Sequence, residues 1–216
     1  MTRRLLMCVL VLTAPALTQA QPRVEVTVGA VGTGASSAGT TRATLTNPVG
    51  DPLVLFTAEH RTQAAIGLEG AVAVRLSAGW LVELSGSWLR PDLETRVSDD
   101  FEGADPATLS SGTHRFTALL GAVREFGRRG RLVPYVRVEA GWLRELTADR
   151  ALVENGVAAH AGAGLKYRVR EAPSGWLSHI ALRAEGRLAM RRGGLTLGDA
   201  GTRWSPALLA GLVIAR

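Results

Sequence analysis

The sequence predicts an all-β protein, an eight-stranded antiparallel up-and-down transmembrane β-barrel. Three observations support this fold class. Eight stretches have the two-residue period of β-strands, the connections between them alternate in length, and no charged residue interrupts the apolar row on one face of each stretch. We find no convincing helical repeat. The expected strands cover residues 23–31, 64–76, 80–92, 113–126, 133–146, 157–168, 176–189 and 204–215.

The composition belongs to a folded, largely apolar chain. Of the 216 residues, 46% are hydrophobic and 20% are charged, which excludes a charge-rich disordered protein. The net charge of +6 invites a nucleic-acid partner. The arginines are scattered, however, and they often lie two residues from a glutamate, with neither a basic run nor an aromatic RNA-binding motif. We therefore expect no binding to nucleic acid.

Residues 1–20 have the layout of a cleavable signal peptide. A basic pair precedes a short apolar core, and small residues stand at the two positions that signal peptidase reads. An uncleaved membrane anchor is the alternative, but the apolar core is short for one. The single cysteine, Cys8, lies in this segment, so the domain predicted over 21–216 has neither a disulfide nor a thiol nucleophile.

The connections alternate between long and short along the chain. In outer-membrane barrels the short turns face the periplasm, the longer loops face outside, and the strand number is even. We expect the first connection, the longest, to be the main external contact surface. The long connections are 32–63, 93–112, 147–156 and 190–203, and the short ones are 77–79, 127–130 and 169–175.

The two faces of the expected strands differ sharply in chemistry. One face is an uninterrupted apolar row, and the other carries six acids and six bases. An eight-stranded barrel has an interior just wide enough for side chains, which five Trp and many Leu would overfill. We therefore predict that the apolar face meets lipid and the charges pair in the lumen. A soluble periplasmic β-barrel is the architectural alternative. The predicted luminal charge network is Glu25, Glu69, Arg75, Glu83, Arg115, Glu125, Arg137, Glu139, Lys166, Arg183, Glu185 and Arg187.

Aromatic residues gather near the ends of the expected strands. Trp80 and Trp88 are eight residues apart, which is roughly 20 Å along the membrane normal for a tilted strand. A lipid-facing band is about 25 Å tall and has aromatic residues at both edges. Tyr135 has luminal parity instead. The predicted aromatic girdle is Trp80, Trp88, Phe116, Phe126, Trp142, Tyr167, Trp176 and Trp204.

The chain resembles the small outer-membrane β-barrel superfamily, the OmpA/OmpX-like and opacity-type barrels. The resemblance rests on the signal peptide and on residues 121–142, which read GAVREF, a turn and LVPYVRVEAGW. The resemblance covers nearly all of 21–216. It implies a monomer in the outer membrane of a Gram-negative-type envelope, surrounded by outer-membrane lipid and inserted by the barrel-assembly machinery. The chain departs from the family at Arg216, where such barrels usually end in an aromatic residue that aids assembly. Insertion is then expected to be slow, or the machinery tolerant.

Two groups of residues are candidates for catalysis, because a few small barrels of this superfamily act on lipids. Ser110 and Ser111 lie near His114, and Glu59 precedes His60. Nucleophilic catalysis needs a serine, a histidine and an acid that converge in space, and no triad spacing of the family matches. We predict that the protein is not an enzyme and uses no cofactor.

Metal and phosphate sites have little support. The acidic stretch from Asp99 to Asp105 could attract a divalent cation, but a solvated acidic loop is the simpler interpretation. The histidines are not at ligand spacing, and the Gly-rich residues 32–39 lack the lysine and helix of a phosphate loop.

The sequence therefore favours a non-enzymatic role in surface structure, adhesion or envelope integrity through the external loops, whose partner it does not identify. A small solute channel and a lipid-modifying enzyme are the alternatives. A filled lumen is expected rather than a pore, because eight strands leave little space.

Overall fold

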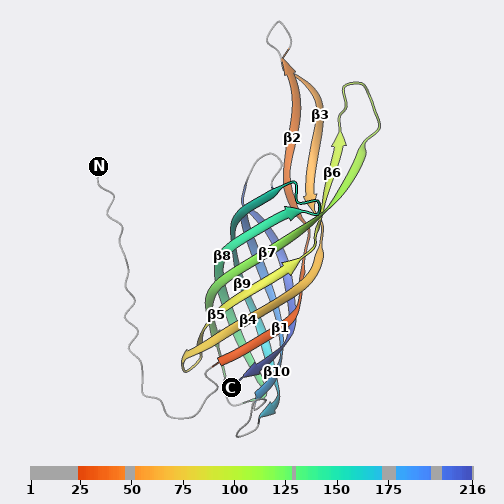
Figure 1. The fold of residues 1–216 in the computed structure, drawn as a ribbon. Helices are drawn as coiled ribbons and strands as arrows, with labels where there is room; N and C mark the ends of the chain where they lie inside the picture. The colour runs from red at the N-terminus through yellow and green to blue at the C-terminus, as the bar shows by residue number, and fades with distance from the viewer. Residues whose placement is uncertain (1–23, 47–51, 128–129, 172–178, 196–200, 216) are drawn as a thin grey trace, which may run out of the picture.

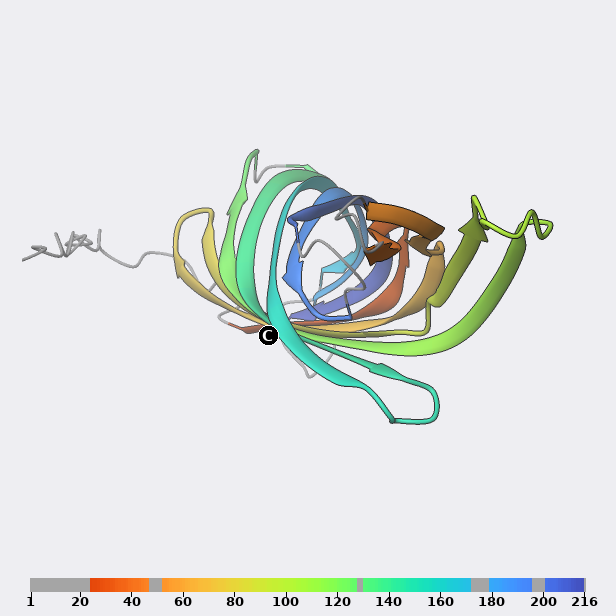
Figure 2. The same cartoon turned by 90° about the horizontal axis from the view of Figure 1, so that it is seen from above.

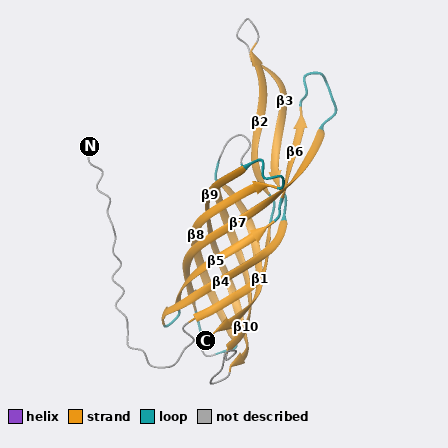
Figure 3. Cartoon of the chain, in the orientation of Figure 1, coloured by secondary structure: helices purple, strands orange, loops and turns teal. Residues whose placement is uncertain are grey.

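The computed structural model describes residues 24–46, 52–127, 130–171, 179–195 and 201–215. Every regular element among them is a β-strand (Figure 3). No helix in this part of the chain is long and apolar enough to cross a membrane. The predicted signal peptide, 1–20, lies outside the described residues.

Eight strands close into an antiparallel barrel (Figure 1, Figure 2). Each pairs with the next one along the ring, and the last returns to the first, with Val28 opposite Leu212. The predicted eight-stranded up-and-down fold is confirmed. In ring order the strands are β1 (Val24–Thr33), β4 (Ala65–Ser77), β5 (Trp80–Leu89), β7 (Ala107–Glu125), β8 (Leu132–Thr147), β9 (Val153–Glu171), β10 (His179–Gly193) and β11 (Arg203–Ala215).

Three further strands extend beyond the barrel at its long-loop end (Figure 1). They are β2 (Ser36–Thr46), β3 (Pro52–Thr62) and β6 (Asp92–Ser98). In the order β2-β3-β6-β7 they pair with residues 107–112 of β7 to form what we call the external sheet. The interpretation of 32–63 and 93–112 as connections without strands was therefore wrong. Neither face of these strands is uniformly apolar, so the pattern that marked the barrel strands is absent here.

The short turns keep neighbouring barrel strands in register. Gly79, in the turn between β4 and β5, has a φ of 96°. This left-handed conformation favours glycine because a Cβ would clash there. The amide of Glu125 donates to the Gly79 carbonyl at 2.8 Å. The turn is thereby attached to the neighbouring strand β7.

Strand β8 shows how the two-residue period sorts side chains between the two sides of the barrel wall. Val136 and Val138 are 43% and 59% exposed, whereas Arg137 and Glu139 are 2% and 5% exposed. Tyr135 shares the inward face, as its parity predicted. The outer surface of the barrel is therefore apolar, and the interior is charged.

We expect Val138→Arg to lower the free energy of unfolding by about 2–4 kcal/mol, because Val138 lies midway along an outward face that would meet the centre of the bilayer. The measurement is urea unfolding of protein folded into lipid vesicles. Val54→Arg is the matched control, since Val54 is exposed on the external sheet, and it should change stability by less than about 0.5 kcal/mol. Equal tolerance of both changes would show that the outward face does not contact lipid.

Candidate functional site: the charged interior and the external sheet

All twelve residues of the predicted luminal network lie inside the barrel. Eleven are buried, and the twelfth, Arg75, has a side chain that is 11% exposed. They come from seven strands of the ring. Together with Glu145, Arg191, Arg203 and His160, they form three layers of ion pairs along the barrel axis, which we call the turn-side, central and loop-side layers.

The turn-side layer consists of Glu25, Arg75, Glu125 and Lys166 and balances two acids with two bases. The Lys166 ammonium donates to Glu25 at 2.6 Å and to Glu125 at 2.7 Å. Arg75 donates to the same two carboxylates at 2.5 and 2.8 Å. Each carboxylate is therefore shared by two cations, which offsets the cost of removing the four charges from water.

The central layer is organised around Arg137. Its guanidinium lies 3.2 Å from Glu69, 3.1 Å from Glu83, 2.5 Å from Glu139 and 3.5 Å from Glu185. These acids come from β4, β5, β8 and β10, so a single side chain joins strands across the lumen. The layer also contains Arg183, Arg187 and His160, and Arg187 forms an ion pair with Glu69.

Tyr135 completes the central layer. Its hydroxyl donates to Glu185 and accepts from Arg183 Nε, both at 2.8 Å. The Arg183 guanidinium also lies 4.8 Å from the centre of the tyrosine ring. Gly164 provides the space, because a Cβ there would lie 2.5 Å from the tyrosine oxygen. The tyrosine thus fills the lumen with its hydroxyl fully paired.

The loop-side layer was only partly predicted. Arg115 was expected to face the lumen, and the structure places it against Glu145 at 2.5 Å. Arg191 lies 2.9 Å and Arg203 3.9 Å from the same carboxylate. Glu145, Arg191 and Arg203 were missed because they lie at or just beyond the ends of the expected strands. The parity of the charged face, extended from Glu139 and Arg187, could have found the first two.

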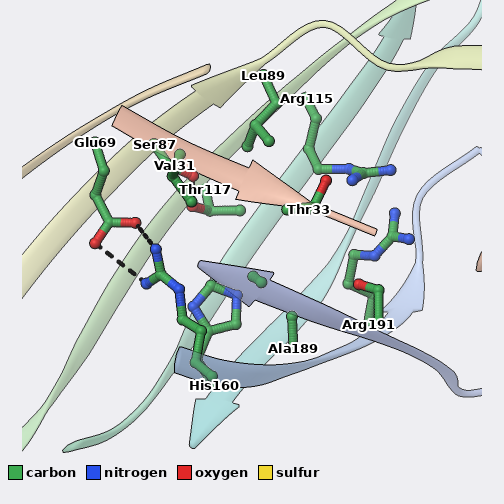
Figure 4. A pocket seen from close by; sticks show the side chains of 13 residues that line it. Val31, Thr33, Glu69, Ser87, Leu89, Arg115, Thr117, His160, Ala189 and Arg191 are labelled. Atoms are coloured by element: carbon green, nitrogen blue, oxygen red, sulfur yellow. Dashed lines mark hydrogen bonds and ion pairs between the residues drawn. The ribbon is translucent and has the colours of Figure 1, made fainter. Parts of the chain in front are cut away.

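A pocket lies between the central and loop-side layers (Figure 4). Its space for the centres of water molecules is about 20 Å³, enough for about one or two waters. Glu69, Arg187 and His160 lie on its central-layer side, and Arg115 and Arg191 on its loop side. Side chains therefore fill most of the described interior.

The aromatic residues predicted to form a girdle lie on the outer surface where they are described. Trp80, Phe126 and Tyr167 lie toward the short turns, and Trp88 pairs across the strands with Phe116 toward the loops. Trp142 and Trp204 are exposed at the loop end as well. Trp176 lies outside the described residues. These seven side chains mark two aromatic edges around the apolar band.

The catalytic candidates do not converge. Ser110 and Ser111 are exposed on the external sheet, whereas the His114 ring stacks on Trp88 at a centroid distance of 6.2 Å. His60 lies between two threonine hydroxyls, and Glu59 projects from the opposite face of β3. The arrangement needed for nucleophilic catalysis is therefore not formed by these residues.

The acidic stretch from Asp99 to Asp105 is exposed. Asp100 accepts a hydrogen bond from the Glu102 amide at 3.0 Å, as in a local turn. Within the described ranges, no three His, Cys, Asp or Glu side chains are grouped so that they could hold a metal ion.

His60 links three strands of the external sheet. Its Nδ1 lies 2.9 Å from the Thr95 hydroxyl on β6, and its Nε2 lies 3.4 Å from the Thr41 hydroxyl on β2. The side chain is buried, and burial lowers the pKa of His60 below its ordinary value, because the charged imidazolium would lose its hydration. The neutral ring is therefore the form that the folded sheet favours.

Comparison with known proteins shows similarity in fold but none in sequence family. No family model matches the chain, and no curated protein matches its sequence. The outer membrane protein OprG from Pseudomonas aeruginosa matches with a TM-score of 0.55 at 12% identity, over 90% of this chain and 96% of that one. Neisserial surface protein A (NspA) matches with a TM-score of 0.51 at 12% identity, over 89% and 97%.

This chain has the fold of a small outer-membrane β-barrel. The resemblance that residues 121–142 indicated is confirmed at the level of the fold. Identities this low carry no further property from OprG or NspA to this chain.

We expect Arg137→Gln to lower the free energy of unfolding by about 3–5 kcal/mol, because it leaves several buried carboxylates without their shared cation. Urea unfolding in detergent micelles, followed by tryptophan fluorescence, measures it. Arg124→Gln is the control, since Arg124 lies on the outer surface over Trp80 at 5.1 Å, and its loss should cost less than about 1 kcal/mol. Equal effects of the two changes would contradict the central role of Arg137.

The external sheet should lose stability as the pH falls. In the unfolded state the pKa of His60 is about 6.5, and in the folded sheet its pKa is lower. Below about pH 6.5 the unfolded state therefore binds more protons than the folded state, and a falling pH favours unfolding. Hydrogen exchange, corrected for its intrinsic pH dependence, should show weaker protection of β2, β3 and β6 at about pH 5.5 than at about pH 7.5. His60→Gln should remove the difference. An equal loss of protection in β8 would contradict this assignment.

Proposed function

We propose that this chain is a non-enzymatic integral protein of the outer membrane of a Gram-negative-type envelope, with a structural, adhesive or envelope-integrity role carried by its external sheet. The observation that carries the proposal is the orientation of the barrel wall, with an apolar surface outside and paired charges inside. A soluble barrel needs the opposite orientation, because water solvates its outer face. Outer-membrane lipid is thus the proposed surroundings of the barrel, with export through residues 1–20 and insertion by the assembly machinery.

The filled interior supports a structural role over a solute channel. Eight strands enclose a lumen that side chains can fill. Here three layers of ion pairs cross it, and Tyr135 and Arg137 lie among its most buried side chains. A solute would have to displace a paired buried charge, at the energetic cost of leaving its partner unpaired.

The external sheet supports a role at the cell surface. The face of the sheet opposite His60 carries charges of both signs, including Glu59, Arg61 and Arg96. The face that carries His60 also carries Leu109, which is exposed. One edge of the sheet, β2, comes last in the strand order, where its backbone can pair with another chain. The sheet thus extends polar contacts and a strand edge away from the membrane.

The first experiment is the gel migration of membrane-extracted protein in SDS with and without heating. A closed barrel that resists detergent should migrate differently before heating. Planar-bilayer recordings of the same preparation should show no steady conductance. Recovery of the protein in the soluble periplasmic fraction, with no heat-dependent shift, would contradict the proposed location, and a steady conductance would favour a channel.

The surface role is tested by replacing residues 36–62 with a short glycine-containing linker. The heat-dependent shift should remain, because the eight ring strands are intact, whereas adhesion of expressing cells to host or neighbouring cells should fall to the background of a strain without the protein. Arg124→Gln, on the outside of the barrel, is the matched control. Unchanged adhesion after the replacement would assign the role to another part of the chain.

A further inference from the structure

Three arginines point outward from the loop-side end of the barrel wall. They are Arg90, which directly follows β5, Arg144 on β8 and Arg192 on β10. Each is exposed, whereas the residue before it in the chain is buried. The two-residue period of the strands therefore places all three side chains on the outer surface of the barrel. We call these three residues the basic collar.

The basic collar lies just beyond the aromatic edge on the loop side. Each of its residues is two positions further toward the loops than an outward tryptophan, or than the cross-strand partner of one. The tryptophans are Trp88 for Arg90, Trp142 for Arg144 and, through its partner Met190, Trp204 for Arg192. Two residues of a tilted strand advance about 5 Å along the membrane normal. The collar is therefore at the depth where lipid head groups adjoin the apolar band.

The collar has no carboxylate partner of its own. Within the described ranges, none of its three arginines forms a hydrogen bond or an ion pair. The outward positions between them are His114 on β7 and Asn155 on β9, and neither is acidic. Asp92 is two residues beyond Arg90, and no ion pair joins the two. The luminal arginines are paired with glutamates, so the collar differs from them in leaving its positive charge uncompensated.

The chemistry and spacing of the collar favour phosphate groups of lipids. A guanidinium group presents five N–H donors in a fork that matches a phosphate, and it keeps its charge. One strand separates each collar residue from the next, so their backbones are about 10 Å apart. Arginines at this spacing can each meet a different head group along the barrel wall, whereas a single free phosphate ion would leave most of them without a partner.

We infer that the basic collar binds the phosphate groups of anionic lipids in the leaflet on the loop side. This inference rests on the proposed location of the barrel in a membrane and adds a preference for one class of lipid. The tryptophans fix the depth of the barrel, and the arginines just beyond them donate hydrogen bonds to the head groups. A cationic side chain near an anionic membrane surface raises affinity about fivefold.

The test measures quenching of tryptophan fluorescence by brominated lipids, with the full barrel folded into phosphatidylcholine vesicles. Trp80 and Trp176 are replaced by phenylalanine in every variant, so that of the five tryptophans only the three beside the collar fluoresce. Dibrominated phosphatidic acid, which carries a phosphomonoester, should quench several-fold more effectively than dibrominated phosphatidylcholine at the same mole fraction. Combined Arg90→Gln, Arg144→Gln and Arg192→Gln changes should remove most of this preference.

The matched control removes the same number of charges from the external sheet. Arg42→Gln, Arg61→Gln and Arg96→Gln together should keep the preference of the parent protein, because these exposed arginines lie on β2, β3 and β6. If the combined collar variant does not fold, Arg144→Gln alone should lower the preference, and Arg42→Gln alone should not. An equal loss in the collar and control variants would assign the attraction to net charge and overturn the inference.

The remaining outcomes separate the collar from the location of the barrel. Equal quenching by the two lipids in the parent protein, or a preference that the collar changes leave intact, would overturn the inference. Loss of the preference on adding inorganic phosphate, but not sulfate at equal ionic strength, would show that the collar takes the free ion instead of a lipid. A barrel that does not float with the vesicles would contradict both the proposed function and the inference, whereas one that floats without a preference would contradict the inference alone.

Discussion

The rest of the structure depends on pairing buried charges inside a space that admits only side chains. An eight-stranded wall with an apolar outer face must turn every other residue of each strand inward. In this chain those inward residues include seven glutamates, seven arginines and a lysine. Burying any one of these charges without a partner would cost more free energy than the fold can offset, so the barrel can close only when the charges form ion pairs. Because Arg137 contacts acids from four different strands, the pairing also fixes which strands face one another across the lumen.

Small residues make this pairing possible. A long side chain that turns into a narrow lumen is accommodated where its register partner on the neighbouring strand has no Cβ. Gly164 provides this for Tyr135, and Gly121 provides it for Glu139, where a Cβ would lie within 3 Å of the glutamate backbone. The small residues of the barrel strands are thus complementary in volume to the long charged ones. The charge layers and the glycines together explain why the interior is filled without tryptophan.

The sequence predicted the barrel because its ring strands follow a simple rule, with one apolar face and one charged face. Alternation of apolar and charged residues marked the ring strands and the facing of Arg137 and Glu139. The prediction failed for the strands that do not follow this rule. Beyond the end of the barrel, β2 and β3 have two mixed faces, and their pairing depends on cross-strand contacts such as His60 with Thr95, which no periodicity predicts. Arg203 was missed for a related reason, since it is the first residue of its strand, and the side of the wall it faces depends on where the strand begins.

The three layers also divide the chain into parts with different constraints. Among the described residues, the turn-side layer is balanced, and the central layer holds four glutamates against three arginines and His160, so the excess cations of this part of the chain lie at the loop end. That end lies beneath the external sheet, and Arg191 donates to Ser36, the first residue of β2. The one side-chain hydrogen bond described between the lumen and β2 therefore starts from the layer with unbalanced charge. The charged interior therefore contacts the first residue of the external sheet at this point.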